Sequence, residues 1–342
     1  MNHPASPPTA PAAWYREPAL WPVERREIFA RGWQFATHVS ALSEPRSWRA
    51  ETLAGYPVIF VRDEKGEVRG FHNVCRHRAG PLVRGESGVC DGALTCQYHG
   101  WRYALDGRLR AARDFGAAAD FDPREYGLLP IRVELWRGLV FAAIAANAPP
   151  LADMLAPLDR RLGDADWSRL KIGLRRAHLL ECNWKTYVEN YLEGYHVPAM
   201  HPGLDAEILS ERYRVYVEGQ VAIHEAPARL PDPVYQGLWA WIWPNIGLNV
   251  YKSGLMIERM APIGHAQTRL DYLYLTPDGE SVPAATLDMS DTVTAEDKWI
   301  TERVQENLNA GIYHMGRLSP KHESAVAAFQ LWVGAALKAP AS

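Results

Sequence analysis

Two short motifs between Asn73 and Tyr103 constrain this chain more than any other feature. Cys75 and His77 have one residue between them, and Cys96 and His99, further along, have two. Both pairs lie in loops that contain glycine. Because two thiolates and two imidazoles at such short spacings form a set of four metal ligands, the sequence predicts a metal centre here.

The distribution of the ligands distinguishes between kinds of metal centre. A single zinc ion usually takes cysteines paired with cysteines and histidines paired with histidines. Here each loop supplies one Cys and one His, which suits a cluster of two irons in which one iron binds both thiolates and the other both imidazoles. A structural zinc site and unrelated loop residues are the alternatives.

The motifs C-x-H and C-x2-H resemble the Rieske [2Fe–2S] signature, and the YHGW run at 98–101 extends the resemblance. The resemblance implies that Cys75, His77, Cys96 and His99 hold a [2Fe–2S] cluster.

The bulk composition is that of a globular protein with more than one domain. The chain has 342 residues, of which 47% are hydrophobic and 23% charged, so two average domains are expected. A net charge of −3 gives no reason to expect a nucleic acid or an anionic membrane as partner. The sequence shows neither a signal peptide nor an apolar run of about 18 residues, so a cytoplasmic location is expected. Cys90 and Cys182 are expected to be buried thiols rather than a disulfide.

Changes in composition and hydrophobic period divide the chain into four segments. Residues 1–13, rich in Pro and Ala, are expected to be a disordered tail, and residues 14–46 a helical segment that packs on the catalytic domain. Short β-branched segments between turns at 47–148 predict a small antiparallel β domain that carries the cluster loops. Residues 149–342 combine antiparallel strands with long helices, which is an α+β arrangement. The expected strands of this last segment lie near 213–226, 237–252, 254–262 and 268–276, and its closing helices near 293–311 and 320–338.

A second group of chemistry-bearing residues follows Asn183, where a helix is predicted. Glu189, Glu193 and His196 recur at spacings of four and three, which would place them on one face of that helix. Pro198 is expected to end the helix.

The turn after that helix allows His201 to approach His196, and Asp297 lies in the first turn of a later predicted helix. Two histidines and one carboxylate leave half of an iron coordination sphere open for dioxygen and substrate, as in non-haem Fe(II) oxygenases.

The run E-x-Y-H-x4-H from Glu193 to His201, with NWK before it, resembles the iron-binding signature of the oxygenase (α) subunits of Rieske non-haem iron oxygenases. The resemblance spans roughly residues 14 to 340. It implies a Rieske domain followed by a helix-grip, START-like catalytic domain with a curved antiparallel sheet. It also implies that His196, His201 and Asp297 hold a mononuclear Fe(II), and that Glu193 and Asn183 act in catalysis.

The same resemblance implies the terminal oxygenase of a multicomponent system. A ferredoxin or flavin reductase would supply electrons from NAD(P)H, and O2 would be the co-substrate in the hydroxylation or demethylation of a small organic molecule. The α subunits of this family form head-to-tail trimers, so a homotrimer is expected in which a cluster histidine of one subunit meets Glu193 of the next.

One departure from the commoner family pattern bears on the substrate. Glu193 stands where most ring-hydroxylating members have Asp, and members that act on choline, glycine betaine, carnitine or stachydrine resemble this chain in having Glu. Their ED-x4-E-x-VQ segment reads here from Glu296 and Asp297 to Gln305. The resemblance therefore favours a monooxygenase or N-demethylase of quaternary ammonium compounds.

Candidate substrate residues come from an aromatic segment. Trp239, Trp241 and Trp243 alternate at strand period and would share one face, where they could form an aromatic cage for a methylammonium group. Alternatively, they fill the groove between sheet and helix. Tyr251 and Met256 are further candidates.

Two other functions remain open from the sequence alone. One is an aromatic-ring dihydroxylating dioxygenase α subunit, which usually works with a separate β subunit. The other is a Rieske electron carrier without catalysis, although such proteins end soon after the cluster domain and this chain continues well beyond it.

Overall fold

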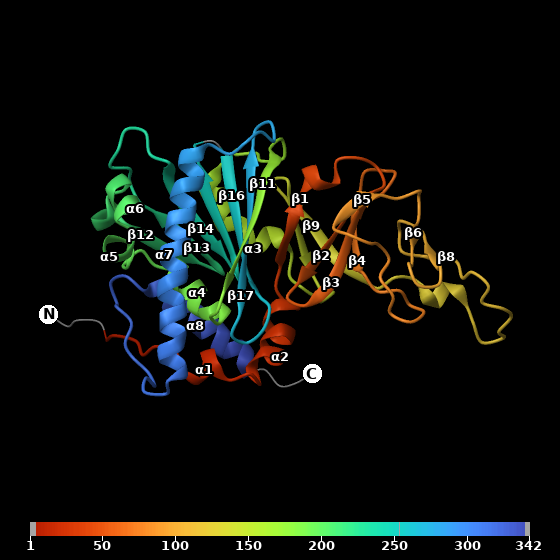
Figure 1. Ribbon diagram of the computed structural model, residues 1–342, viewed down its shortest axis with the longest axis horizontal. Coiled ribbons are helices and arrows are strands. Elements are labelled where there is room, and N and C mark those ends of the chain that lie inside the picture. The colour runs from red at the N-terminus through yellow and green to blue at the C-terminus, as the bar shows by residue number, and fades with distance from the viewer. Residues whose placement is uncertain (1–4, 253, 339–342) are drawn as a thin grey trace. The chain divides into compact units, whose positions relative to one another are not determined.

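The computed structural model describes residues 5–252 and 254–338, and this part of the chain forms two compact units. The first unit comprises residues 30–148 with the short segment 166–169, and the second comprises the remainder. The first is an antiparallel β domain, and the second combines a twisted antiparallel sheet with long helices (Figure 1). The predicted α+β class and the order of the two domains are confirmed.

The first unit is built almost entirely from short strands. Its elements are β1 (Gln34–His38), η2 (Val39–Leu42), β2 (Ser47–Leu53), β3 (Tyr56–Arg62), β4 (Val68–His72), β5 (Ser87–Val89), β6 (Leu94–Thr95), β7 (Arg102–Tyr103), β8 (Leu109–Ala111), η3 (Pro123–Tyr126), β9 (Pro130–Trp136) and β10 (Leu139–Ala143). Seven of these strands form one sheet in the order β1-β10-β9-β4-β3-β2-β5, and β6, β7 and β8 form a second, small sheet.

Strand β3 explains why the larger sheet has a core on each side. Side chains alternate between the faces of a strand, so Val58 and Phe60 enter one hydrophobic cluster while Ile59 and Val61 enter another. The cluster around Ile59 also contains the two candidate ligand cysteines. The loops that carry the candidate iron–sulfur ligands are therefore anchored in one of the two hydrophobic cores of this unit.

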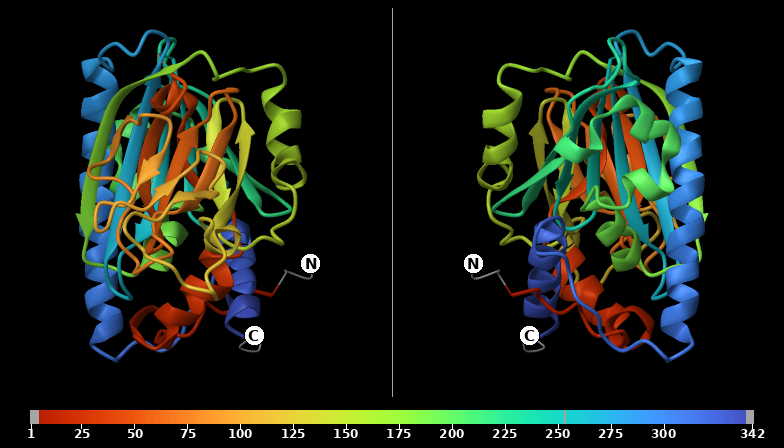
Figure 2. Two further views of the ribbon diagram at one scale, coloured as in Figure 1. Left: turned by 90° about the vertical axis from the view of Figure 1, so that its right-hand side faces the viewer. Right: turned by 90° about the vertical axis from the view of Figure 1, so that its left-hand side faces the viewer.

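The second unit surrounds a sheet with helices. Its helices are α1 (Ala13–Arg16), α2 (Leu20–Glu24), the π-helix η1 (Arg25–Phe29), α3 (Leu151–Leu162), α4 (Trp184–Tyr191), α5 (Val197–Met200), α6 (Pro202–Glu207), η4 (Ser210–Arg212), α7 (Ala284–Asn309) and α8 (Ser324–Leu337). Its strands are β11 (Lys171–Leu180), β12 (Arg214–Glu218), β13 (Val221–Glu225), β14 (Tyr235–Ile242), β15 (Ile246–Tyr251), β16 (Gly254–Pro262) and β17 (Thr268–Thr276). They pair in the order β11-β17-β16-β15-β14-β13-β12, and α7 and α3 lie on opposite sides of the sheet (Figure 2).

Helix α7 packs on the sheet through a polar stripe rather than an apolar one. Its buried residues recur every three or four positions, and most are small and polar: Thr286, Ser290, Thr294, Asp297, Thr301, Gln305 and Leu308. Two of the hydroxyl groups pair with tyrosines of β17, Thr294 with Tyr272 at 2.9 Å and Ser290 with Tyr274 at 2.7 Å. The helix begins at Ala284, well before the predicted start at 293. The prediction missed its first turns because a polar stripe gives no apolar periodicity.

Two of the predicted long strands are hairpins. The segment expected at 213–226 contains β12 and β13 with Gly219 in the turn at φ 58°, a conformation that favours glycine. The segment expected at 237–252 contains β14 and β15. Trp243 therefore lies beyond the end of β14 rather than in one strand with Trp239 and Trp241.

The N-terminal segment differs from the prediction in two respects. Residues 30–46 belong to the first unit and not to the catalytic domain, because β1 is buried along its whole length and pairs with β10. The tail expected to be disordered is ordered from residue 5, since the backbone of Thr9 and Ala12 hydrogen-bonds to Gly316 and His314. Residues 1–4 of that tail lie outside the described residues.

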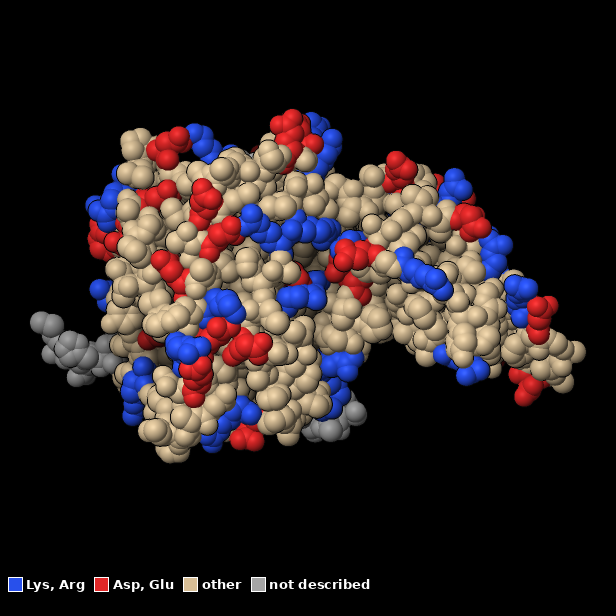
Figure 3. Space-filling view, viewed as in Figure 1, with Lys and Arg blue, Asp and Glu red and all other residues tan. Residues whose placement is uncertain are grey.

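The distribution of surface charge and the state of the cysteines agree with what the sequence predicts. On the face shown in Figure 3, Lys and Arg side chains are interspersed with Asp and Glu. Within residues 5–252 and 254–338, no helix has the length and apolar character that crossing a membrane requires. Cys90 and Cys182 are free thiols, of which Cys182 is buried and Cys90 half-buried.

A buried ion pair attaches the N-terminal helices to α4. Lys185 and Glu24 form this pair, and both side chains are 1% exposed. The Trp184 indole N–H donates to the second oxygen of Glu24 at 2.8 Å. Burial lowers the pKa of Lys185, and Glu24 opposes that effect. Since α4 leads directly into the candidate iron ligands, this pair fixes the base of the site.

We expect Glu24→Gln to destabilise the protein by about 3–5 kcal/mol, because it leaves the Lys185 ammonium group buried without a counter-charge. Urea unfolding followed by circular dichroism measures the loss. The double variant Glu24→Gln/Lys185→Met should recover most of it, since it removes both charges. A double variant no more stable than Glu24→Gln would show that packing, and not charge, is responsible.

Candidate active site and cluster site

The chain reaches the candidate iron ligands through a break between two helices. Helix α4 ends at Tyr191, and His196 is the N-cap residue of the short helix α5. Between them, Gly194 packs so closely on the ring of Tyr213 that a Cβ atom would lie 2.6 Å from it. A side chain at this position would push the two segments apart.

Two local predictions are therefore wrong. Glu189, Glu193 and His196 do not share a helix face, because the helix ends before Glu193. Glu189 is half-buried elsewhere and accepts hydrogen bonds from Tyr15 and Gln330. Pro198 does not end a helix but lies in the first turn of α5, where its missing N–H costs nothing.

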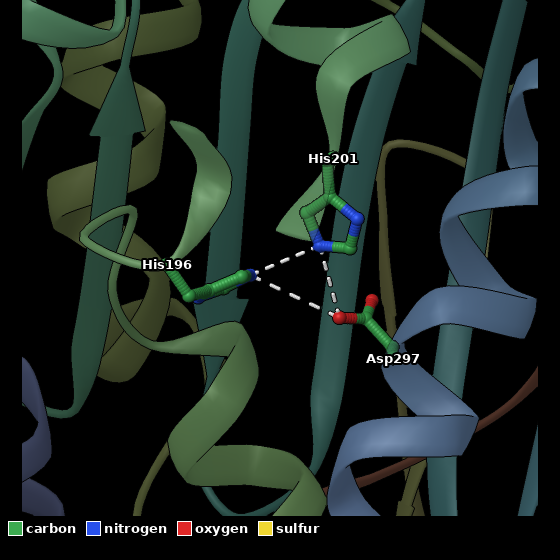
Figure 4. A group of neighbouring side chains, drawn as sticks. All are labelled: His196, His201 and Asp297. Atoms are coloured by element: carbon green, nitrogen blue, oxygen red, sulfur yellow. Dashed lines mark hydrogen bonds and ion pairs between the residues drawn. The ribbon is translucent and has the colours of Figure 1, made fainter. Parts of the chain in front are cut away.

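Three side chains from different elements converge at one point (Figure 4). His196 and His201 flank α5, and Asp297 reaches them from α7. The Nε2 atoms of the two histidines are 3.1 Å apart, and His201 Nε2 lies 3.1 Å from Asp297 Oδ1. His196 Nε2 lies 3.8 Å from the same oxygen. One ligand atom from each residue lies within 4.8 Å of the others, close enough to share a metal ion.

Each of the three side chains is held from behind by a second polar group. Glu193 accepts from His196 Nδ1 at 2.6 Å, and Glu296 contacts His201 Nδ1 at 2.7 Å. Asn190 donates to Asp297 Oδ1 at 2.7 Å. A carboxylate at Nδ1 favours the tautomer that leaves Nε2 free to bind a metal. The arrangement fits two neutral imidazoles and one carboxylate as ligands, with the remaining positions open.

The surroundings of His201 also favour a cation at this point. Burial lowers the pKa of His201, but Asp297 and Glu296 outweigh that effect and raise it above its ordinary value. The same negative charges that stabilise an imidazolium would stabilise a metal cation. Asp297 and the two histidines thus form a site whose charge and donor atoms suit Fe(II).

A cavity opens beside the triad. Its volume is about 80 Å³, and because one water needs roughly 10–15 Å³ by this kind of measure, it has room for several waters or a small organic group. Its wall is mainly aromatic and carboxylic, and the residues that line it include Tyr187, Tyr191, Glu193, Tyr213, His224, Tyr235, Trp239, Asn249, Met256, Glu258, Tyr272 and Asp297.

The first unit brings the four predicted cluster ligands together. Cys75 and Cys96 are each 2% exposed within the same hydrophobic cluster, whereas His77 and His99 are half-buried. The Nδ1 atoms of the two histidines are 3.1 Å apart. Paired thiols inside and paired imidazoles toward the surface fit a two-iron cluster with one thiolate-bound and one imidazole-bound iron.

Neighbouring groups hold these ligands in place. The Tyr103 hydroxyl lies 3.1 Å from Cys75 Sγ, and the indole of Trp101 stacks on His77 at a centroid distance of 4.9 Å. Gly80 is required for close approach, since a Cβ atom there would lie 3.1 Å from Cys96 Sγ. Burial raises the pKa of the Cys75 thiol, so a metal is needed to hold it as thiolate at neutral pH.

Several predicted site residues lie elsewhere. Asn183 is not among the residues that line the cavity; it caps α4 by accepting from the Lys185 backbone N–H at 3.0 Å, and its catalytic role stays a prediction. Trp241 and Trp243 are misassigned, because both pack against Phe329 and Trp332.

The remaining substrate candidates lie at or near the cavity. Met256 and Trp239 line it. Tyr251 stands one layer behind, with its ring 4.9 Å from that of Tyr235, which does line it.

Sequence reasoning missed other residues of the cavity. Glu258 lies two residues after Met256 in β16, so strand period would have placed it on the same face. His224 and Asn190 carry no comparable signal, because their positions depend on how β13 and α4 face the cavity.

Comparison with known proteins agrees with this geometry. Residues 32–122 match the Rieske [2Fe-2S] domain, and residues 164–231 and 205–339 match the catalytic domain of ring hydroxylating alpha subunits. Choline monooxygenase from Arabidopsis thaliana is 29% identical over 90% of this chain and 78% of that protein. The carnitine monooxygenase oxygenase subunit of Escherichia coli (strain K12) is 28% identical over 91% of this chain and 87% of that protein.

Solved structures show the same fold along nearly the whole chain. The quaternary ammonium Rieske monooxygenase CntA in complex with L-carnitine superposes with a TM-score of 0.85 and 26% identity, covering 97% of this chain and 96% of that one. A naphthalene 1,2-dioxygenase superposes with a TM-score of 0.75 at 18% identity, over 97% of this chain and 94% of that one, and shows the fold alone.

A Rieske domain joined to such a catalytic domain is an oxidoreductase with a [2Fe–2S] cluster and a mononuclear iron. It uses O2, and electrons from NAD(P)H through a reductase, to hydroxylate or demethylate a small organic molecule. The catalytic domain excludes a Rieske protein that only carries electrons. The chain belongs to the Rieske non-haem iron oxygenases, as an oxygenase α subunit.

Proposed function

We propose that this α subunit is a monooxygenase or demethylase of a quaternary ammonium compound. The observation that carries the proposal is the aromatic wall of the cavity beside the triad. Six aromatic side chains line it: Tyr187, Tyr191, Tyr213, Tyr235, Trp239 and Tyr272. Aromatic rings around a cation contribute about 0.5–2 kcal/mol each, and cages of this kind recognise methylated ammonium groups.

The relatives support the same substrate class. Two of them are named choline monooxygenase and carnitine monooxygenase. The Glu at position 193 resembles the motif of the members that act on quaternary ammonium compounds. The cage that we propose uses Trp239, not Trp241 or Trp243. Its small volume favours a compact head group over a fused arene.

We assign the iron to His196, His201 and Asp297 and the cluster to Cys75, His77, Cys96 and His99. The iron, when bound, supplies the activation of dioxygen. The protein positions the ligands, since Glu193 and Glu296 keep Nδ1 of the two histidines occupied and turn Nε2 toward the metal. The aromatic wall excludes water and places a methyl group beside the open coordination positions.

A second candidate is an arene dihydroxylase, the kind of enzyme that naphthalene 1,2-dioxygenase, a protein of the same fold, is named for. Such α subunits usually associate with a small β subunit. Co-purification of such a subunit with the native protein would support this function over ours.

We further propose that the subunits form a homotrimer in the cytoplasm and pass electrons across their interfaces. Glu193 is suited to this transfer because one of its oxygens already contacts His196 of its own chain. A cluster histidine of a neighbouring subunit could approach the same carboxylate, in an interface that closes into a ring. Inter-subunit electron transfer is described for a quaternary ammonium Rieske monooxygenase of the same fold, which is 26% identical to this chain.

The substrate class can be tested directly by a screen. With a surrogate reductase and NADH, we expect O2 uptake to rise with choline, glycine betaine, carnitine or stachydrine, and formaldehyde to appear if a methyl group is removed. Methyl ethers and arenes should give no comparable response. Arene turnover to a dihydrodiol, with no response to any quaternary amine, would contradict the proposal.

The carboxylate ligand can be tested separately from the cluster. Asp297→Ala should lose mononuclear iron and turnover while the cluster retains its EPR signal, since the ligands of the cluster lie in the other unit. Asp288→Ala is the matched control, because Asp288 is an exposed carboxylate on the same helix. If Asp297→Ala keeps its iron and activity, the carboxylate is misassigned.

Electron transfer between subunits predicts complementation of two inactive variants. Cys75→Ser removes the cluster and His201→Ala the iron, so neither variant alone should turn over substrate. In a mixed oligomer made from equal amounts, random assembly places an intact cluster against an intact iron at about one interface in four. We therefore expect about a quarter of wild-type activity, measured as O2 uptake. Transfer within one chain predicts none, and a fully active monomer would exclude the mechanism.

A further inference from the structure

One carboxyl oxygen in the cavity has no hydrogen-bond partner. Glu258 of β16 is 3% exposed and lines the cavity, and its Oε1 atom has no hydrogen-bond partner among the described residues. Buried polar atoms in folded proteins are almost always hydrogen-bonded, so an exception calls for an explanation such as a catalytic role or a bound group. The free oxygen of Glu258, on the wall of the cavity beside the triad, leaves room for a substrate group.

The other carboxylates of the cavity are occupied. Glu193 contacts His196, and Asp297 contacts His201 and Asn190. Glu258 is therefore the carboxyl group that is free to meet a substrate.

The cavity wall offers Glu258 no Lys or Arg among the described residues. His224 also lines it, but burial lowers the pKa of His224 to about 3, which favours the neutral imidazole. His196 and His201 are assigned to the iron, and Glu193, Glu296 and Asp297 already contact these two histidines. The substrate is therefore the counter-charge that remains for Glu258.

The environment explains why this carboxyl group needs a cation. Burial raises the pKa of Glu258 to about 8, and the charge of Asp297 raises it too, while hydrogen bonding from Tyr187, Tyr272 and Asn249 lowers it. An ionised Glu258 is costly in an empty cavity. A cation beside it offsets that cost, since the attraction between opposite charges is strong where water is excluded.

We propose that Glu258 is the counter-charge for the trimethylammonium group of the substrate, so that the cavity selects positive charge and not only methyl groups. This inference rests on the proposed function and deepens it. The aromatic rings surround the methyl groups, and Glu258 supplies the charge that the rings lack. Because Glu258 and Asp297 line the same cavity, a head group held by Glu258 keeps its methyl groups beside the triad.

The test compares choline with 3,3-dimethylbutan-1-ol, in which carbon replaces the ammonium nitrogen and the shape is unchanged. Calorimetric titration of the holoenzyme should show that the wild-type protein prefers choline. Glu258→Gln keeps the side-chain size but removes the charge, and should weaken choline binding roughly 30-fold or more. Binding of the neutral alcohol should change little. Glu225→Gln, on another strand and outside the cavity, should alter neither affinity.

Two controls separate a charge effect from a loss of structure. Glu258→Asp should restore part of the preference for choline, and the cluster EPR signal and iron content of Glu258→Gln should match the wild-type protein. Equal weakening of both ligands by Glu258→Gln, or a wild-type protein with no preference for choline, would overturn the inference. A protein that prefers choline through Glu258 but oxidises no quaternary amine would leave this inference standing and refute the proposed function.

Discussion

The polar contact between α7 and the sheet is the interaction on which the second unit depends. Its buried face is a row of hydroxyl, carboxyl and amide groups with little apolar surface, and Tyr272 and Tyr274 of β17 hydrogen-bond to two of them. Hydrophobic contact is non-directional, whereas a hydrogen bond fixes distance and angle. The helix is therefore held in one rotation and one register, and that register decides where Asp297 points. A helix held only by leucines would tolerate a small rotation that moves the carboxylate away from the two histidines.

The other half of the triad is positioned by buried charge below it. Helix α4 is anchored by the Lys185–Glu24 ion pair at its start and by Glu189, which accepts from Tyr15, near its end. Burial raises the pKa of Glu189 to about 7, so this carboxyl group stays in place through hydrogen bonds more than through charge. A buried ion pair such as Lys185–Glu24 contributes little net stability but is costly to break, so it holds α4 in a single arrangement. The short N-terminal helices thus act as part of the active site although none of their residues lines the cavity.

The parts of the site that could be predicted from sequence are those whose ligands are close together along the chain. Cys75 with His77, and His196 with His201, are local spacings, and the structure brings both sets together as expected. Asp297 was a candidate from its place on a later predicted helix, and the family resemblance identified it as the third ligand; no local spacing connects it to His201, which lies almost a hundred residues earlier. The end of the helix at Tyr191 was missed because it depends on a tertiary contact. Gly194, just after the helix, packs against the ring of Tyr213, which local sequence does not reveal. The aromatic cage was misplaced for a similar reason: strand period gives the face of a residue, but which part of that face α8 covers depends on packing. That is why Trp241 lies under a helix while Trp239, two residues earlier, lines the cavity.

The charges around the triad show why Glu258 differs from the other acids. A divalent iron brings two positive charges to a point where Glu193, Glu296 and Asp297 already contact the ligand histidines. These three carboxylates carry enough negative charge to balance the two charges of the metal. Glu258 is outside that group and faces no Lys or Arg among the described residues of the cavity wall, and burial raises its pKa to about 8, which favours the neutral form when no substrate is bound. Its ionisation and the entry of a cation therefore favour each other, because each reduces the cost of the other. A neutral molecule of the same shape gains nothing from this coupling, and an anion is repelled. Selectivity for charge thus follows from one carboxyl group without a cationic partner in the protein, while the aromatic wall accounts for selectivity for shape.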